Sequence, residues 1–237
     1  MSAFLDSFTT AAQLIGQADP VLWQTVSLSL RVSGTACLLG AGFGLALGAW
    51  LAVVRFPGHG LVVGVLNTLL ALPSVVVGLI IYLLLSRAGP LGSWGILFTP
   101  TAMVIAQSML VVPLTAALSR RLLLGAMADG GEQLRSMGAG PFTMAALLLV
   151  HERYGVITLL LTAFGRAVSE VGAVMIVGGN IDGVTRVMTT TIALETSKGD
   201  LPLALALGVV LLGVVAVINL LIAALQLRGG KAAEALA

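Results

Sequence analysis

The sequence predicts an all-α integral membrane protein with about five transmembrane helices. Hydrophobic residues make up 58% of the 237 residues and charged residues only 9%, whereas a soluble domain carries about 25% charged residues. Several apolar stretches reach the roughly 20 residues that a helix needs to cross the hydrocarbon layer. Lipid must therefore be the solvent for most of the chain. Most of the basic residues lie at the ends of these stretches, so no nucleic-acid-binding face is indicated.

Residues 1–20 form the first predicted element, an amphipathic helix that lies on the membrane interface. Apolar residues recur there at helical spacing, namely Phe4, Phe8, Ala11, Ala12 and Ile15. Such a stripe is typical of a helix whose apolar face enters the headgroup region. A poorly ordered tail is the alternative.

Residues 22–227 contain the predicted membrane spans. These run from about Val26 to Val54, Leu61 to Leu85, Phe98 to Leu118, Tyr154 to Gly178 and Leu201 to Leu227. In the first span, glycines at four-residue spacing predict close approach of another helix backbone, because lipid gives apolar side chains no reason to leave it. These glycines are Gly40, Gly44 and Gly48.

Two prolines predict kinks, since proline removes a helical hydrogen bond. They are Pro73 in the second span and Pro113 in the third.

The positions of Lys and Arg predict the direction of the spans. With residues 119–153 in the cytoplasm, the cytoplasmic side carries Arg55, Arg120, Arg121, Arg135, Arg153, Arg228 and Lys231, and the other side only Arg87, Arg186 and Lys198. We therefore expect the N-terminus outside and the short tail 228–237 in the cytoplasm.

A short charged helix, bounded by glycines, is predicted at about residues 129–140. Asp129 can cap its start with Glu132 in the reciprocal position. Gly138 suits the left-handed residue that ends a helix, and Arg135 lies between them. We expect this helix to fit a groove of another protein.

This segment resembles a known motif. Glu132 and Gly138 match the start of the EAA loop, E-A-A-x-x-x-G followed by I-x-L-P, of binding-protein-dependent ABC importer permeases. Gln133 and Leu134 replace the two alanines, and LLVH at 148–151 replaces I-x-L-P. The segments GRAVSEVGAVMIVGGN and TRVMTTTIALETSKGDLPLALALG resemble the tungstate-type branch of these permeases, to which molybdate and sulfate permeases are related.

The resemblance implies the type I ABC importer permease fold and a transport role in the inner membrane of a prokaryote. It implies a homodimer, two ABC ATPase subunits that dock on the coupling helix and carry the ATP and Mg themselves, and an extracytoplasmic oxyanion-binding protein. No cofactor is expected in this chain. It also lacks a P-loop, because its only Gly-Lys pair, Gly230-Lys231, is followed by Ala232.

Polar residues within the spans are candidates for the translocation path or gate. Arg166 and Glu170 share a helix face, and charges in a span usually face water or another helix. They form either a structural ion pair or a part of the gate. Asn67 and Ser74 either pass an oxyanion along by hydrogen bonds or join helices.

The polar segment 179–200 is expected outside the membrane. Thr189, Thr190 and Thr191 are expected to contact the binding protein, with residues 187–194 forming a short helix in the mouth between the two copies. A solvated loop is the alternative.

Two other function classes fit the sequence less well. An ion-coupled secondary transporter could use Glu170 as an ion carrier, but such proteins often contain internal repeats, and no self-similarity is evident between the halves. The chain has no G-x-S-x-G, H-E-x-x-H or paired intramembrane Asp, which argues against an intramembrane enzyme.

Overall fold

The computed structural model describes the backbone of residues 2–234 and the side chains of residues 8–227. Over the described backbone the chain is helical, with no strand. It divides into two compact units, each assembled from segments distant in sequence. Unit 1 comprises Met1–Ala36, Pro73–Gln107 and Gly165–Val217, and unit 2 comprises Cys37–Leu72, Ser108–Phe164 and Ile218–Ala237.

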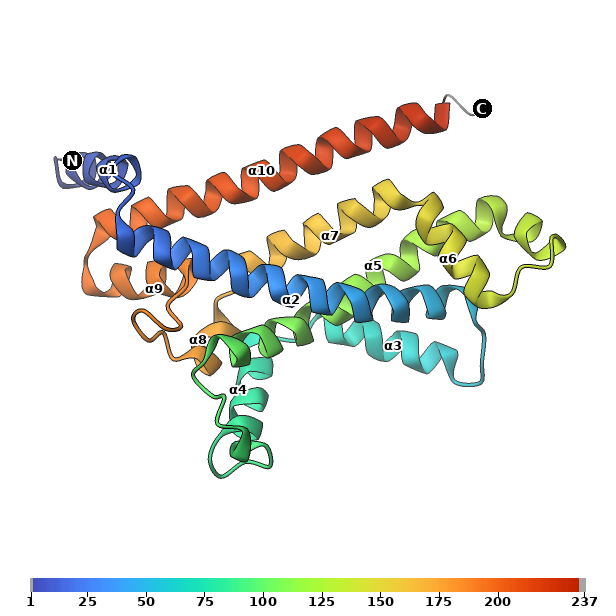
Figure 1. Ribbon diagram of the computed structural model, residues 1–237, viewed down its shortest axis with the longest axis horizontal. Coiled ribbons are helices and arrows are strands. Elements are labelled where there is room, and N and C mark those ends of the chain that lie inside the picture. Colours follow the sequence, from blue (N-terminus) through green and yellow to red (C-terminus); the bar gives the residue numbers. More distant parts are fainter. Residues whose placement is uncertain (1, 235–237) are drawn as a thin grey trace. The chain divides into compact units, whose positions relative to one another are not determined.

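The helices follow one another without intervening sheet structure (Figure 1). In chain order they are α1 (Ser2–Gly16), α2 (Pro20–Val53), α3 (His59–Leu70), α4 (Ser74–Leu85), the 3-10 turn η1 (Gly92–Trp94), α5 (Pro100–Ser136), α6 (Pro141–His151), α7 (Arg153–Val168), α8 (Gly172–Gly178), α9 (Met188–Lys198) and α10 (Leu201–Glu234).

Among the described residues, three helices are long and apolar enough to cross a membrane: α2, α5 and α10 up to Leu227. The pairs α3 with α4 and α6 with α7 meet the same criteria as bent pairs, which raises the number of spans to as many as five. The prediction of an all-α chain with about five spans is therefore confirmed.

Three of the predicted spans differ from single straight helices with the predicted bounds. The second is interrupted, because α3 ends at Leu70 and α4 starts at Ser74. Pro73 is the N-cap residue of α4 with φ −62° and ψ 125°, so this proline separates two helices instead of kinking one. The third span does not end near Leu118, since α5 continues through Pro113 to Ser136. The fourth is interrupted between Val168 and Gly172.

Unit 2 confirms the predicted close approach at the glycines of α2. A Cβ atom added to Gly40 would lie 2.7 Å from Val111 Cγ1, and one added to Gly44 would lie 2.8 Å from the carbonyl oxygen of Val112. Gly48 is packed in the same way against the next turn of α5. Only hydrogen atoms fit at these positions, so the glycines determine how closely α2 and α5 pack.

Unit 1 has its own apolar core, to which α1 contributes. Ala11 of α1 is buried in one cluster with Leu22 and Val26 of α2, Met188 of α9 and Leu207 of α10. The predicted N-terminal helix is thus present. Its position at a membrane interface stays a prediction, and the predicted apolar residue Phe4 lies outside the described side chains.

Candidate functional site

The charged pair Arg166 and Glu170 lies in unit 1, where the chain breaks between α7 and α8. The Glu170 side chain is only 4% exposed. Its Oε2 atom accepts a hydrogen bond from Arg166 Nη1 at 2.7 Å, and its Oε1 atom accepts one from the backbone N–H of Gly172 at 2.9 Å. The side chain of Ser74 lies beside Gly172, close to this carboxylate. A buried carboxylate needs several such partners to offset the loss of hydration.

Close packing brings Ser74 to this position. A Cβ atom on Gly172 would lie 2.9 Å from Ser74 Oγ, and one on Gly78 would lie 2.8 Å from the Cα atom of Ala173. The start of α4 therefore lies against the start of α8, and the two helices run side by side in Figure 1. Ser74 therefore lies close to Arg166 and Glu170, an arrangement that the sequence did not predict, and the two absent side chains at Gly78 and Gly172 make room for it.

Asn67, predicted to share a polar patch with Ser74, is placed differently. It lies exposed on α3 in unit 2, whereas Ser74 begins α4 in unit 1. Because the chain is interrupted between these helices, the two residues do not share a helix face.

Arg166 is the exposed member of the charge pair. Its side chain is 58% exposed, although apolar residues flank the pair at 156–164 and 171–177. A guanidinium group facing hydrocarbon would cost several kcal/mol, so intramembrane charges almost always face a water-filled cavity or another helix. We therefore conclude that the Arg166 side of α7 faces water or protein.

The backbone groups freed by the break are bonded to side chains from other helices. Gln107 Nε2 of α5 donates to the carbonyl oxygen of Ala167 at 2.9 Å. Thr189 Oγ1 of α9 donates to the carbonyl oxygen of Glu170 at 2.7 Å. Non-helical backbone at membrane depth requires such partners, because lipid offers none.

Neither of these two hydrogen bonds was predicted, although Thr189 was a predicted site residue with a different role. Gln107 is only 3% exposed, and a glutamine inside an apolar stretch was the available signal. Its bonding partner could not be inferred, since the break at 169–171 was not expected.

The threonines Thr189, Thr190 and Thr191 are turned inward, at 7%, 0% and 1% exposure. Thr190 Oγ1 donates to Asn180 Oδ1 at 2.8 Å, and Thr191 Oγ1 to the carbonyl oxygen of Val187 at 2.7 Å. The short helix predicted at 187–194 is present as α9. Contact with a binding protein stays a prediction, and these three hydroxyl groups do not form an exposed surface of the chain.

The predicted charged helix is present, but as the last turns of α5. Asp129 lies inside the continuous helix Pro100–Ser136, so its predicted role as an N-cap was wrong. Asp129, Glu132 and Arg135 are all exposed. Gly138 has φ +80°, the left-handed conformation expected of it, and α6 begins at Pro141.

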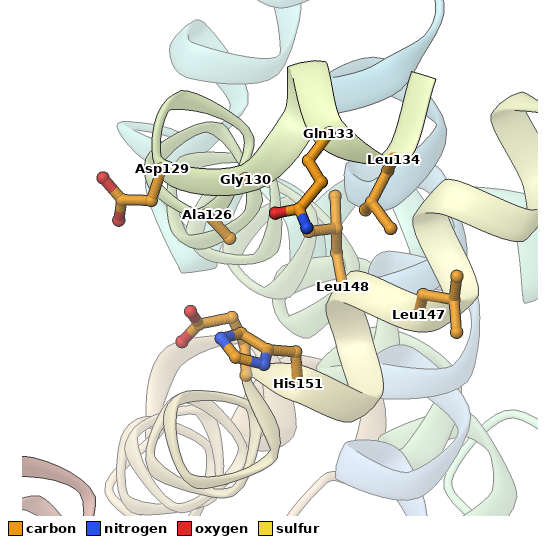
Figure 2. A pocket seen from close by; sticks show the side chains of 9 residues that line it. Ala126, Asp129, Gly130, Gln133, Leu134, Leu147, Leu148 and His151 are labelled. Carbon is orange, nitrogen blue, oxygen red and sulfur yellow. The ribbon is translucent and has the colours of Figure 1, made fainter. Parts of the chain in front are cut away.

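A groove lies beside this end of α5 in unit 2, with a volume of about 410 Å³. Figure 2 shows Asp129 and Gln133 of α5 on one side and Leu147, Leu148 and His151 of α6 on the other. The lining combines apolar side chains, among them Ala126, Leu134 and Leu148, with the acidic Asp129 and Glu152. This corner therefore combines an exposed acidic and basic helix end with a hollow that a protruding side chain of another protein can enter.

Known permease proteins are similar to the chain over most of its length. It is 41% identical over 226 residues to the tungstate uptake system permease protein TupB of Peptoclostridium acidaminophilum, covering 95% of this chain and 99% of that one. It is 43% identical over 204 residues to a probable anion ABC transporter permease protein of Haloferax volcanii, covering 82% and 86%. The molybdenum transport system permease protein ModB of Escherichia coli K12 is 33% identical over 192 residues, covering 75% and 82%.

A solved structure supports the same fold. A chain of the MetNI methionine ABC transporter in an inward-facing conformation matches with a TM-score of 0.56 and 18% identity, covering 92% of this chain and 96% of that chain. This likeness confirms the predicted fold. No family model matches the chain.

Proposed function

The chain belongs to the oxyanion-transporting family of ABC transporter permeases that includes the tungstate permeases, and we propose that it is the membrane-spanning subunit of a tungstate importer. The observation that carries this proposal is the 41% identity to a tungstate permease over nearly the full length of both chains. We place the protein in the inner membrane of a prokaryote, with two copies forming the pathway and a separate extracytoplasmic protein delivering tungstate.

ATP hydrolysis on a partner ATPase drives transport in this proposal. The chain lacks a P-loop, so ATP and Mg belong to the partner. We assign the docking surface to the end of α5 and the adjacent groove, with Asp129, Glu132, Arg135 and Gly138 as the coupling residues. The support is that these residues are exposed, that Asp129 lines the groove, and that the left-handed Gly138 turns the chain into α6.

Translocation of the oxyanion uses Arg166, Glu170 and Ser74 in this proposal. Arg166 supplies donors on an exposed side chain, and Glu170 neutralises its charge. A tungstate dianion is thus attracted only weakly, which suits a pathway in which release must be fast.

Reconstitution tests the proposal. Proteoliposomes that contain this chain, its ATPase and the loaded binding protein should take up tungstate in an ATP-dependent manner, measured by elemental analysis of the vesicles. Glu132→Ala and Gly138→Ala should lower uptake, the latter because a left-handed non-glycine residue costs about 1–2 kcal/mol. Gly125→Ala is the matched control, since no atom lies within 4 Å of an added Cβ at Gly125 or Gly138. Normal uptake by both coupling variants would refute the docking assignment.

Molybdate or sulfate is the second candidate substrate, because the molybdenum permease is related at 33% identity. Molybdate uptake that exceeds tungstate uptake in the same vesicles would favour it. Uptake driven by a proton gradient without ATP would instead favour a secondary transporter with Glu170 as carrier.

A further inference from the structure

Thr189 makes a contact that its neighbours do not. Its hydroxyl group donates to the backbone carbonyl of Glu170, 2.7 Å away and on a different element. The hydroxyl of Thr191 instead bonds within α9, to Val187, and that of Thr190 bonds to Val187 and to the adjoining loop at Asn180. Thr189 is therefore the residue of this trio that ties α9 to the break between α7 and α8.

The first turn of α9, which carries Thr189, is itself held by other helices. The backbone N–H of Met188, next to Thr189, donates to Ser29 Oγ of α2 at 2.7 Å. Met188 is fully buried against Leu22 and Leu207 in the core of unit 1. The first turn of α9 is thus anchored to α2 and α10, and a displacement of α9 is transmitted to Glu170 through the Thr189 hydroxyl.

Glu170 in turn holds Arg166. Its backbone is fixed by Thr189, while its carboxylate bonds to Arg166 at 2.7 Å and to the Gly172 N–H at 2.9 Å. If the Thr189 bond is lost, the carbonyl of Glu170 is left buried without this partner, and an unsatisfied buried acceptor costs about 1–3 kcal/mol. The break is then free to rearrange.

We infer that Thr189 is a positioning residue for translocation: it fixes the break between α7 and α8 and, through Glu170, the exposed guanidinium of Arg166. It does so from inside the protein, not as a contact for the binding protein. The transport part of this inference rests on the proposed function.

The first measurement needs no transport. A nitroxide label is placed at Ser169→Cys, an exposed position within the break, in a Cys37→Ala background that removes the only native cysteine. Thr189→Val should raise the ratio of mobile to immobile label by about fivefold in the spin-resonance spectrum, the order expected for one buried hydrogen bond. Thr189→Ser, which keeps a hydroxyl, should restore the native ratio.

Thr25→Val is the matched control. Thr25 is 5% exposed in unit 1, and its hydroxyl bonds to Val21 of its own helix. Thr25→Val likewise replaces a buried threonine hydroxyl by a methyl group, and it should leave the mobility of the label at position 169 unchanged. If Thr189→Val does not fold, Thr189→Ala supports the same comparison.

The second measurement separates positioning from docking. In reconstituted vesicles Thr189→Val should lower the maximal uptake rate about fivefold, while the KM for loaded binding protein stays within twofold. Equal label mobility in Thr189→Val and Thr25→Val, or a change confined to that KM, would overturn the inference. If the native permease takes up no tungstate, the proposed function fails, and the label mobility still decides the role of Thr189.

Discussion

At the scale of single residues, the described side chains of unit 1 include two buried carboxylates that are each paired with an exposed base. Glu170 pairs with Arg166, and Glu195 pairs with Lys198 at 3.0 Å with side-chain exposures of 7% and 52%. They differ in what else they hold. The Glu170 carboxylate also accepts a hydrogen bond from the Gly172 N–H, at a break in the backbone, so it holds both the break and the Arg166 guanidinium in place. Glu195 can therefore serve as a control for substitutions of Glu170 within the same unit.

Glu170→Gln should convert a weak oxyanion contact into a tight one. Glutamine keeps the size and can still accept from Gly172, but Arg166 loses its counter-charge and attracts a dianion more strongly. We expect the permease in nanodiscs to gain measurable tungstate affinity by calorimetry and to lose about tenfold in maximal uptake, roughly 1.4 kcal/mol. Glu195→Gln should change neither. Loss of uptake without any gain in affinity would assign Glu170 a structural role alone.

At the scale of helices, the packing of α2 against α5 depends on the absence of side chains. A Cβ at Gly44 would lie 2.8 Å from both Thr115 Cβ and the Val112 carbonyl oxygen, whereas Gly42 has no atom within 4 Å. Gly44→Ala should therefore destabilise the protein by about 1–3 kcal/mol through overpacking.

Gly42→Ala is the matched control and should stabilise α2 by up to about 1 kcal/mol, because alanine has the higher helix propensity. Thermal unfolding in detergent, followed by tryptophan fluorescence, measures both. Equal midpoints for the two variants would contradict the packing role of Gly44.

The sequence predicted some helix boundaries and missed others for identifiable reasons. Gly138 was correctly placed, because a left-handed glycine ends a helix through its own backbone. Asp129 was misread as a start, since a capping residue begins a helix only where the preceding chain is not helical. Here Ala126 and Ala128 continue α5 through it.

The inward orientation of Thr189 could not be predicted. Hydropathy counts a threonine hydroxyl as polar, yet the group is readily buried where it meets a free carbonyl. That carbonyl belongs to Glu170, in a break that the apolar sequence around it does not reveal.

At the scale of the whole molecule, the fold class was predictable because lipid imposes it. Without water in the bilayer, backbone polar groups must be satisfied internally, so long apolar stretches become helices. What the apolar pattern does not indicate is where such helices are interrupted. The candidate residues Ser74 and Glu170 lie at such interruptions, after α3 and after α7, so the sequence predicted the fold class and these residues, but not the interruptions that bring them together.

Substrate choice should follow the binding protein and not this chain. In the described chain, the charge pair offers one exposed guanidinium whose charge a buried carboxylate neutralises. Tungstate, molybdate and sulfate are dianions of the same charge. The electrostatic interaction of the Arg166–Glu170 pair with each of them should therefore be similar, and the pair can hardly distinguish them. Specificity is a difference between the affinities for two ligands, and a contact that binds both weakly can supply only a small difference.

Exchange of the binding protein tests this. The permease and its ATPase are reconstituted with a tungstate-selective or a molybdate-selective binding protein that docks on this permease, and uptake from an equimolar mixture of the two oxyanions is measured. The uptake ratio should follow the ratio of the binding protein's affinities within about threefold, or roughly 0.6 kcal/mol. A ratio that stays fixed when the binding protein is exchanged would place a selective site within this chain, and Arg166 would be the first residue to substitute.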